Sequence, residues 1–189
     1  MFDVDNFIAD CRSALAERQA PTAVKEVLER ALSRPHEIDA ALGEPERGGI
    51  STLHRSEDLT VLWVVWPPHV SLFPHEHRMW AANGIYGGRE DNIFYRRGVD
   101  GGIVRSGAKD IDAGEVALLG SDAIHSVANP RPRYTAAIHV YGGDFFDTPR
   151  SQWDPDALVE QPFDVEHLRR VLAEADEAAK RNLDPPPSS

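Results

Sequence analysis

The sequence predicts a mainly β fold, a small sandwich or barrel with α-helices at both ends of the chain. Between residues 50 and 141, short runs rich in valine, leucine, tryptophan and tyrosine alternate with glycine-rich breaks. Many short strands joined by such turns are typical of a sandwich or barrel. Before and after this region, apolar residues recur at spacings of three and four, which predicts amphipathic helices.

The composition indicates a soluble globular protein. The chain has 189 residues, enough to bury a sizeable core, and its formal net charge of -11 argues against a nucleic-acid surface. No apolar stretch approaches a membrane span, and the N-terminus lacks the apolar region of a signal peptide. Cys11 is the only cysteine, which excludes an intrachain disulfide. We therefore expect a cytoplasmic monomer or homodimer that binds neither nucleic acid nor membrane.

Three segments are expected within a single domain. In residues 1–47 we expect three helices that pack on the β region. They cover residues 2–19, a segment that begins at Pro21, and residues 35–42. Cys11 falls on the apolar stripe of the first helix, so we expect a small buried side chain. Residues 151–189 predict one helix, over about 165–182, and then a disordered proline-rich tail, 185–189.

Residues 48–150 predict the β-barrel. One expected strand, 59–66, is apolar throughout and should be buried on both faces. A second run leads into His75. The other expected strands are shorter, and they cover residues 80–86, 92–96, 102–105, 115–119, 126–128 and 134–141.

Three histidines of the β region form a candidate metal site. His75 and His77 are two apart, so on a strand both imidazoles lie on the same face. Two nitrogen donors on one face are half a metal site. His125 supplies a third donor in a strand-turn-strand setting, if a small barrel brings the three together. Glu90 and Asp91 could reach the metal only if the strands paired in a different register from the one expected here. We expect them to cap a turn instead.

The order of glycines and histidines resembles the two motifs of the cupins, G-x5-H-x-H-x3,4-E-x6-G and G-x5-P-x-G-x2-H-x3-N. The matching residues are His75, His77 and Gly88 in the first motif, and Gly114, His125 and Asn129 in the second. The departures are His69 for the first glycine, Gly120 and Asp122 for the proline and glycine of the second motif, and Ala81 or Ala82 for the glutamate. That glutamate is a metal ligand in the family, so its loss leaves a three-histidine site. The resemblance implies a double-stranded β-helix fold.

Among cupins, the chain resembles cysteine dioxygenase and its thiol dioxygenase relatives, which hold Fe(II) with three histidines. Their Ser-x-His-x-Tyr segment resembles residues 137–141, with Ala137 in place of the serine. The resemblance covers roughly residues 50–145 and implies that His139 and Tyr141 are catalytic. It also implies that Arg55 binds the carboxylate of a small thiol substrate, with O2 as the second reactant. The chain also looks like a bacterial group of predicted metal-dependent double-stranded β-helix proteins.

Alternatives remain open at the level of metal and reaction. Three histidines also suit Ni, Zn, Mn or Cu. The chain could instead be another metal-dependent cupin enzyme, such as an isomerase or a dioxygenase that cleaves a C–C bond. A third possibility is a cupin that binds a small molecule without catalysis.

Overall fold

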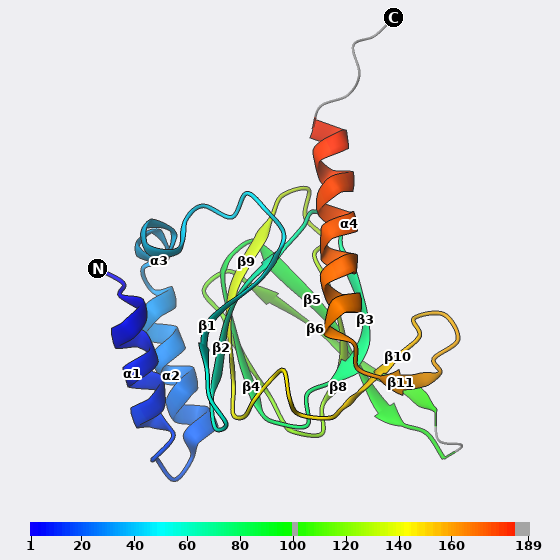
Figure 1. Ribbon diagram of the computed structural model, residues 1–189, viewed down its shortest axis with the longest axis horizontal. Helices are drawn as coiled ribbons and strands as arrows, with labels where there is room; N and C mark the ends of the chain where they lie inside the picture. Colours follow the sequence, from blue (N-terminus) through cyan, green and yellow to red (C-terminus); the bar gives the residue numbers. More distant parts are fainter. Residues whose placement is uncertain (100–101, 184–189) are drawn as a thin grey trace, which may run out of the picture.

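Two antiparallel β-sheets face each other and enclose the interior of the protein, as the computed structural model shows (Figure 1). The structure describes residues 1–99 and 102–183, so the predicted disordered tail lies outside the described residues. One sheet has the strand order β1-β2-β9-β4-β7, and the other has the order β11-β10-β3-β8-β5-β6. The strands are β1 (Gly49–Arg55), β2 (Thr60–Trp66), β3 (Ser71–Glu76), β4 (Ala81–Gly87), β5 (Arg89–Arg97), β6 (Ile103–Asp112), β7 (Val116–Leu119), β8 (Ile124–Ala128), β9 (Thr135–Tyr141), β10 (Ser151–Trp153) and β11 (Glu160–Pro162).

The order of the strands identifies the fold. From β2 to β5, and again from β6 to β9, the chain crosses from one sheet to the other with every strand. Strands that are distant in the sequence therefore become neighbours, as β2 and β9 do. This arrangement is a jelly roll, the double-stranded β-helix of the cupins. The predicted fold class is confirmed.

The N-terminal helices cover the outer face of the first sheet (Figure 1). They are α1 (Val4–Ala14), α2 (Ala20–Leu32) and α3 (Pro35–Leu42). Gly84 of β4 lets α2 approach closely, since a Cβ there would lie 3.0 Å from a methyl group of Leu32 and 3.2 Å from one of Leu28. The first helix is shorter than expected, because residues 15–19 form the turns that lead into Pro21 near the start of α2. Cys11 is fully buried, as predicted.

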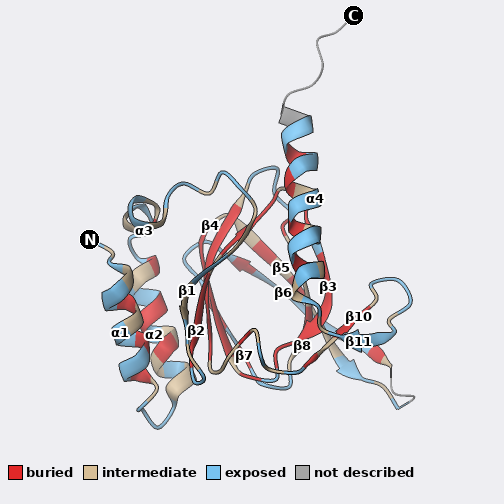
Figure 2. Cartoon of the chain, viewed as in Figure 1, coloured by how far each residue is buried: buried red, intermediate tan, exposed pale blue. Residues whose placement is uncertain are grey.

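Two apolar cores lie on the two faces of the first sheet, and every residue of β2 except Trp63 is buried (Figure 2). Neighbouring residues of β2 point to different cores: Val61 packs toward the helices, and Leu62 packs into the barrel. The prediction that this strand is buried on both faces is confirmed. A barrel with its own apolar core does not need a bound ion in order to fold.

The C-terminal part of the chain adds two strands that the sequence did not predict. The strands β10 and β11 have three residues each, too few for an alternating pattern, and they extend the second sheet. Helix α4 (Val165–Leu183) follows, and Leu168 and Leu172 pack into the barrel core. Strand β6 runs well beyond the predicted residues 102–105, because its exposed second half lacks the apolar signal of a strand. Within the described residues, no helix is long and apolar enough to span a membrane.

Candidate metal centre

The three predicted histidines meet inside the barrel. His75 of β3 and His125 of β8 are directly opposite in the register of the second sheet, and His77 follows β3. All three are buried, and a ligand nitrogen from each lies within 4.8 Å of the other two. The Nε2 atoms of His77 and His125 are 3.0 Å apart. The predicted cluster is therefore formed, and it could hold a metal ion.

Hydrogen bonds fix which nitrogen of two rings is free. Nδ1 of His75 donates to the backbone oxygen of Phe73 at 3.1 Å. Nδ1 of His125 donates to Oδ1 of Asn92 at 2.7 Å. Because both partners are oxygen acceptors, each Nδ1 carries the proton and each Nε2 keeps a lone pair for a metal. Nδ1 of His77 is buried and has no hydrogen-bond partner among the described residues.

The cluster is electrically suited to a cation. Burial lowers the pKa of His75 to about 4, partly offset by the hydrogen bond to the backbone of Phe73. Burial and the neighbouring imidazoles hold the pKa values of His77 and His125 well below the usual range. All three rings are therefore neutral at pH 7, the form in which imidazole binds metals. Two facing Nε2 atoms at this spacing share either the hydrogen of one neutral ring or a metal ion.

The predicted His139–Tyr141 pair lies beside the cluster. Both side chains come from β9 and are buried, and Nδ1 of His139 is 3.1 Å from the hydroxyl of Tyr141. The ring of Tyr141 lies 5.0 Å from the ring of His77. Burial raises the pKa of the Tyr141 hydroxyl, so this group stays protonated at neutral pH. The face of β9 that carries His139 and Tyr141 therefore points into the barrel.

Glu90 is a buried member of the site, and its expected role as a turn cap is wrong. It lies inside β5, because this strand begins at Arg89 rather than at Asn92, and its side chain is completely buried. Its carboxylate accepts hydrogen bonds from Nε1 of Trp66 at 2.9 Å and from Nδ2 of Asn92 at 3.0 Å. Burial raises the pKa of Glu90, but His139 and the two donors outweigh burial, so the net pKa is lowered. Glu90 and Asn92 share one face of a strand, a signal that a longer predicted strand could have used.

The cavity inside the barrel is small, with a volume of about 20 Å³. Space of this size holds one ion or one water molecule. Its lining includes the three histidines, His139 and Tyr141, together with Asn83, whose Oδ1 has no hydrogen-bond partner among the described residues. Phe163 and Leu168 line it from the C-terminal segment.

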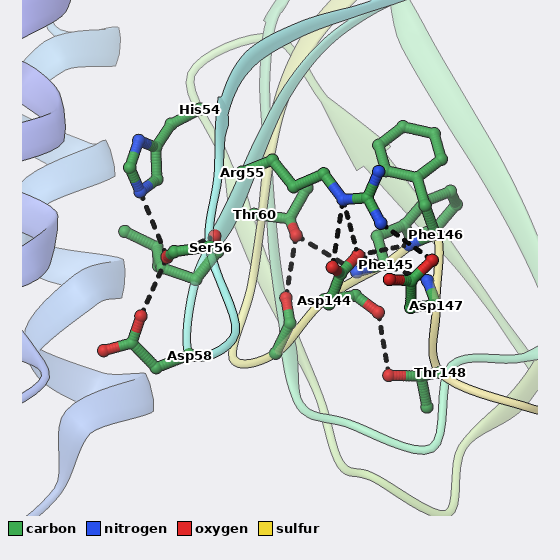
Figure 3. A network of polar contacts seen from close by, with 12 residues as sticks. His54, Arg55, Ser56, Asp58, Thr60, Asp144, Phe145, Phe146, Asp147 and Thr148 are labelled. Atoms are coloured by element: carbon green, nitrogen blue, oxygen red, sulfur yellow. Dashed lines mark hydrogen bonds and ion pairs between the residues drawn. The ribbon is translucent and has the colours of Figure 1, made fainter.

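Arg55 lies on an exposed edge and is engaged by two acidic residues (Figure 3). Its Nε donates to both carboxylate oxygens of Asp144 at 2.9 Å, and its Nη2 lies 2.8 Å from Oδ1 of Asp147. The guanidinium also stacks over the ring of Phe146, and 41% of the side chain is exposed. Arg55 does not line the cavity that contains the histidines. Its role in binding a substrate remains a prediction.

Arg150 is a buried arginine that the sequence analysis missed. It is 8% exposed, and its guanidinium lies between the rings of Phe145 and Phe163, at 4.3 and 3.9 Å from their centroids. Nη1 donates to two backbone oxygens, those of Phe145 and Thr148. Nε and Nη2 are buried and have no partner among the described groups. No sequence pattern marks this residue, since it follows the last predicted barrel strand.

Comparisons with known proteins found similar solved structures but no matching family. No family model matches the chain, and no curated protein matches it. Among solved structures, it is similar to an uncharacterized conserved protein with a double-stranded β-helix domain from Klebsiella pneumoniae, at 14% identity and a TM-score of 0.43, over 52% of this chain and 74% of that one. It is also similar to the DMSP lyase DddQ from Ruegeria pomeroyi, at 17% identity and a TM-score of 0.46, over 58% of this chain and 53% of that one.

A third similar structure is an RmlC-like cupin family protein from Methanocaldococcus jannaschii, at 10% identity and a TM-score of 0.44, over 52% of this chain and 83% of that one. All three TM-scores lie below 0.5, so the strand order of the chain itself carries the assignment of the fold. Fold and site together define a cupin-type double-stranded β-helix with a three-histidine cluster that could bind a metal.

Proposed function

We propose that this chain is a metal-dependent cupin oxidoreductase that uses Fe(II) and O2 to convert a small thiol into a sulfinate. The observation that carries the proposal is a neutral three-histidine cluster with a buried His–Tyr pair beside it. The reaction balances as RSH plus O2 giving RSO2H: both oxygen atoms go to sulfur, and no further reductant is needed. His75, His77 and His125 would hold a ferrous ion, which would supply the redox chemistry.

The residues of the chain would select substrates by charge and would position a proton donor at the site. Three neutral imidazoles leave the charge of a divalent cation uncompensated, which favours an anionic substrate group such as a thiolate. The Tyr141 hydroxyl can donate a hydrogen bond or a proton to a group in the cavity, while His139 orients it. The walls are largely apolar and leave little room for water beside the reacting groups.

A substrate carboxylate has two candidate partners. Arg55 is the residue that the family resemblance suggests, but two aspartates already engage it. Arg150 has two buried donors without partners among the described groups, and its covering rings, Phe145 and Phe163, also contact His77 and His75. A carboxylate would satisfy both donors in the bidentate geometry that arginine favours. Neither arginine lines the cavity itself, so the two unpartnered donors and the adjacent rings are what favour Arg150 over Arg55 for this role.

The direct test is oxygen consumption by iron-loaded protein with a panel of thiols, some with a carboxylate and some without. We expect consumption of one O2 per thiol and a sulfinate product with two oxygen atoms from ¹⁸O2. Zn-loaded protein is the matched control, because it keeps the site filled but lacks redox chemistry. Iron-loaded protein that leaves every thiol of the panel unoxidised would contradict the proposal.

One observation favours a second candidate function. A cavity of about 20 Å³ accommodates an ion but no organic substrate until the walls move. A cupin that binds a metal or another very small ligand without turnover would need no such movement. Metal binding with unchanged thiols, unchanged O2 and no bound organic ligand would support that function.

A further inference from the structure

Glu90 joins the two halves of the site. It lies between the metal cluster, which it reaches through Asn92, and the His139–Tyr141 pair. The three groups that face it are Nδ2 of Asn92, Nε1 of Trp66, and Nε2 of His139 at 3.5 Å. A carboxylate is the one common side-chain group that accepts at both oxygens and donates from neither. Burying it has a large cost, which indicates a role beyond filling space.

The first connection controls a metal ligand. Because Asn92 donates its amide nitrogen to Glu90, its oxygen must face His125. That oxygen can only accept, so the proton of His125 sits on Nδ1 and the lone pair of Nε2 points toward the cluster. Reversing the amide of Asn92 would move the proton to Nε2 and remove this nitrogen as a ligand.

The second connection concerns the pair on β9. An indole N–H can only donate, so the atom of residue 90 that faces Trp66 must be a hydrogen-bond acceptor, here one carboxylate oxygen of Glu90. The same oxygen faces Nε2 of His139, whose other nitrogen contacts the hydroxyl of Tyr141. At 3.5 Å this contact is longer than an ordinary hydrogen bond, and Nε2 has no hydrogen-bond partner among the described residues, so Glu90 acts on the ring as a nearby negative charge that favours an N–H at Nε2.

We infer that Glu90 is a positioning residue for the metal centre: through Asn92 it fixes the tautomer of His125, and through His139 it orients the Tyr141 hydroxyl. The inference rests on metal binding by the three histidines, as in the proposed function, but not on thiol oxidation. Ala137 stands where the thiol dioxygenases have a serine. In this chain, the carboxylate of Glu90, from strand β5, would take the place of that serine beside His139.

The test measures the affinity of the metal-free protein for Co²⁺, by competition with a chelator, and the visible spectrum of the Co²⁺ complex. In Glu90→Gln, the oxygen of the new amide stays with Trp66 because the indole can only donate. The NH2 group of the new amide then faces Asn92, which must turn its own oxygen toward that NH2 group and its own NH2 toward His125. We expect Co²⁺ to bind roughly ten- to a hundredfold more weakly, with an altered spectrum.

A rescue variant separates positioning from mere packing. Asn92→Asp alone places two carboxylates face to face and should also weaken Co²⁺ binding. In the double variant Glu90→Gln/Asn92→Asp, the introduced amide donates to the introduced carboxylate, which again accepts from His125. We expect the double variant to bind Co²⁺ within about threefold of the parent, because each donor again meets an acceptor.

Two controls make the outcomes distinct. Glu57→Gln makes the same charge change on an exposed loop residue and should keep parental affinity. His125→Ala should lose Co²⁺ binding; if it binds as the parent does, the metal site and the inference both fail. Parental affinity in Glu90→Gln, or a double variant no tighter than Glu90→Gln alone, would overturn the inference while leaving the metal site intact.

Discussion

Nε2 of His77 lies 3.0 Å from Nε2 of His125 in the centre of the cluster. Asn92 holds the proton of His125 on Nδ1, so only His77 can place a hydrogen between the two Nε2 atoms. In the metal-free protein, His77 therefore donates from Nε2 to His125. Binding a metal at both atoms moves the proton of His77 to its Nδ1, which lacks a partner among the described residues. Metal binding replaces a hydrogen bond that is already there.

Metal binding should require each of the three histidines. We expect His75→Ala, His77→Ala and His125→Ala each to abolish stoichiometric binding, because two neutral nitrogens make a much weaker site. The apolar core should keep each variant folded without the ion. Elemental analysis and circular dichroism check both statements. His36→Ala, on an exposed position of α3, is the matched control. Full metal occupancy in any of the three variants removes that histidine from the ligand set.

Removing the hydroxyl of Tyr141 should lower turnover and leave metal binding almost unchanged. Tyr141→Phe keeps the ring against His77 and Phe145 and loses only the contact with His139. A positioned proton donor or acceptor contributes about 10²- to 10⁴-fold, so we expect a fall in kcat of that order. The comparison is kcat per bound metal for the variant and the parent. Equal values would make Tyr141 a packing residue.

Thiols with and without a carboxylate should distinguish the two arginines. We expect Arg150→Lys to lower kcat/KM roughly ten- to a hundredfold for carboxylate thiols, because an ammonium cannot make the bidentate contact. Neutral thiols provide an internal control, since they should be affected little. Arg55→Lys is the matched variant on the exposed edge and should have a small effect. The reverse pattern would assign the carboxylate to Arg55, as the sequence predicted.

The metal-free protein should lose stability in mildly acidic solution. The pKa of His75 is about 4 in the folded state and has an ordinary value of 6.5, so the unfolded chain binds the proton first as the pH falls. The free energy of unfolding should therefore decrease from about pH 6.5 downward. Glu90 contributes only below its ordinary pKa of 4.5, so measurements between pH 7 and 5 isolate the histidines. Urea denaturation at three pH values checks this, and a flat profile would contradict it.

The sequence predicted the fold and the metal cluster because both leave short-range patterns. The spacing of His75 and His77 marks one strand face, and glycine-rich breaks mark the turns. The three-residue strands β10 and β11 leave no such pattern. Burial of a charged residue is also invisible in a single sequence, because its partners come from elsewhere in the chain. Glu90 meets Trp66 of β2, and Arg150 meets Phe163 beyond β11, so only the folded chain reveals either residue.

The near-closure of the barrel has a kinetic consequence. Phe163 and Leu168 line a space of about 20 Å³ from the C-terminal side, so a ligand larger than an ion fits only while these side chains are displaced. Such local openings have their own equilibrium, independent of how tightly the histidines bind. The rates at which ligands larger than an ion enter and leave should then depend on how often the segment at the start of α4 opens. An organic ligand in excess would then bind at a rate that does not depend on its own concentration.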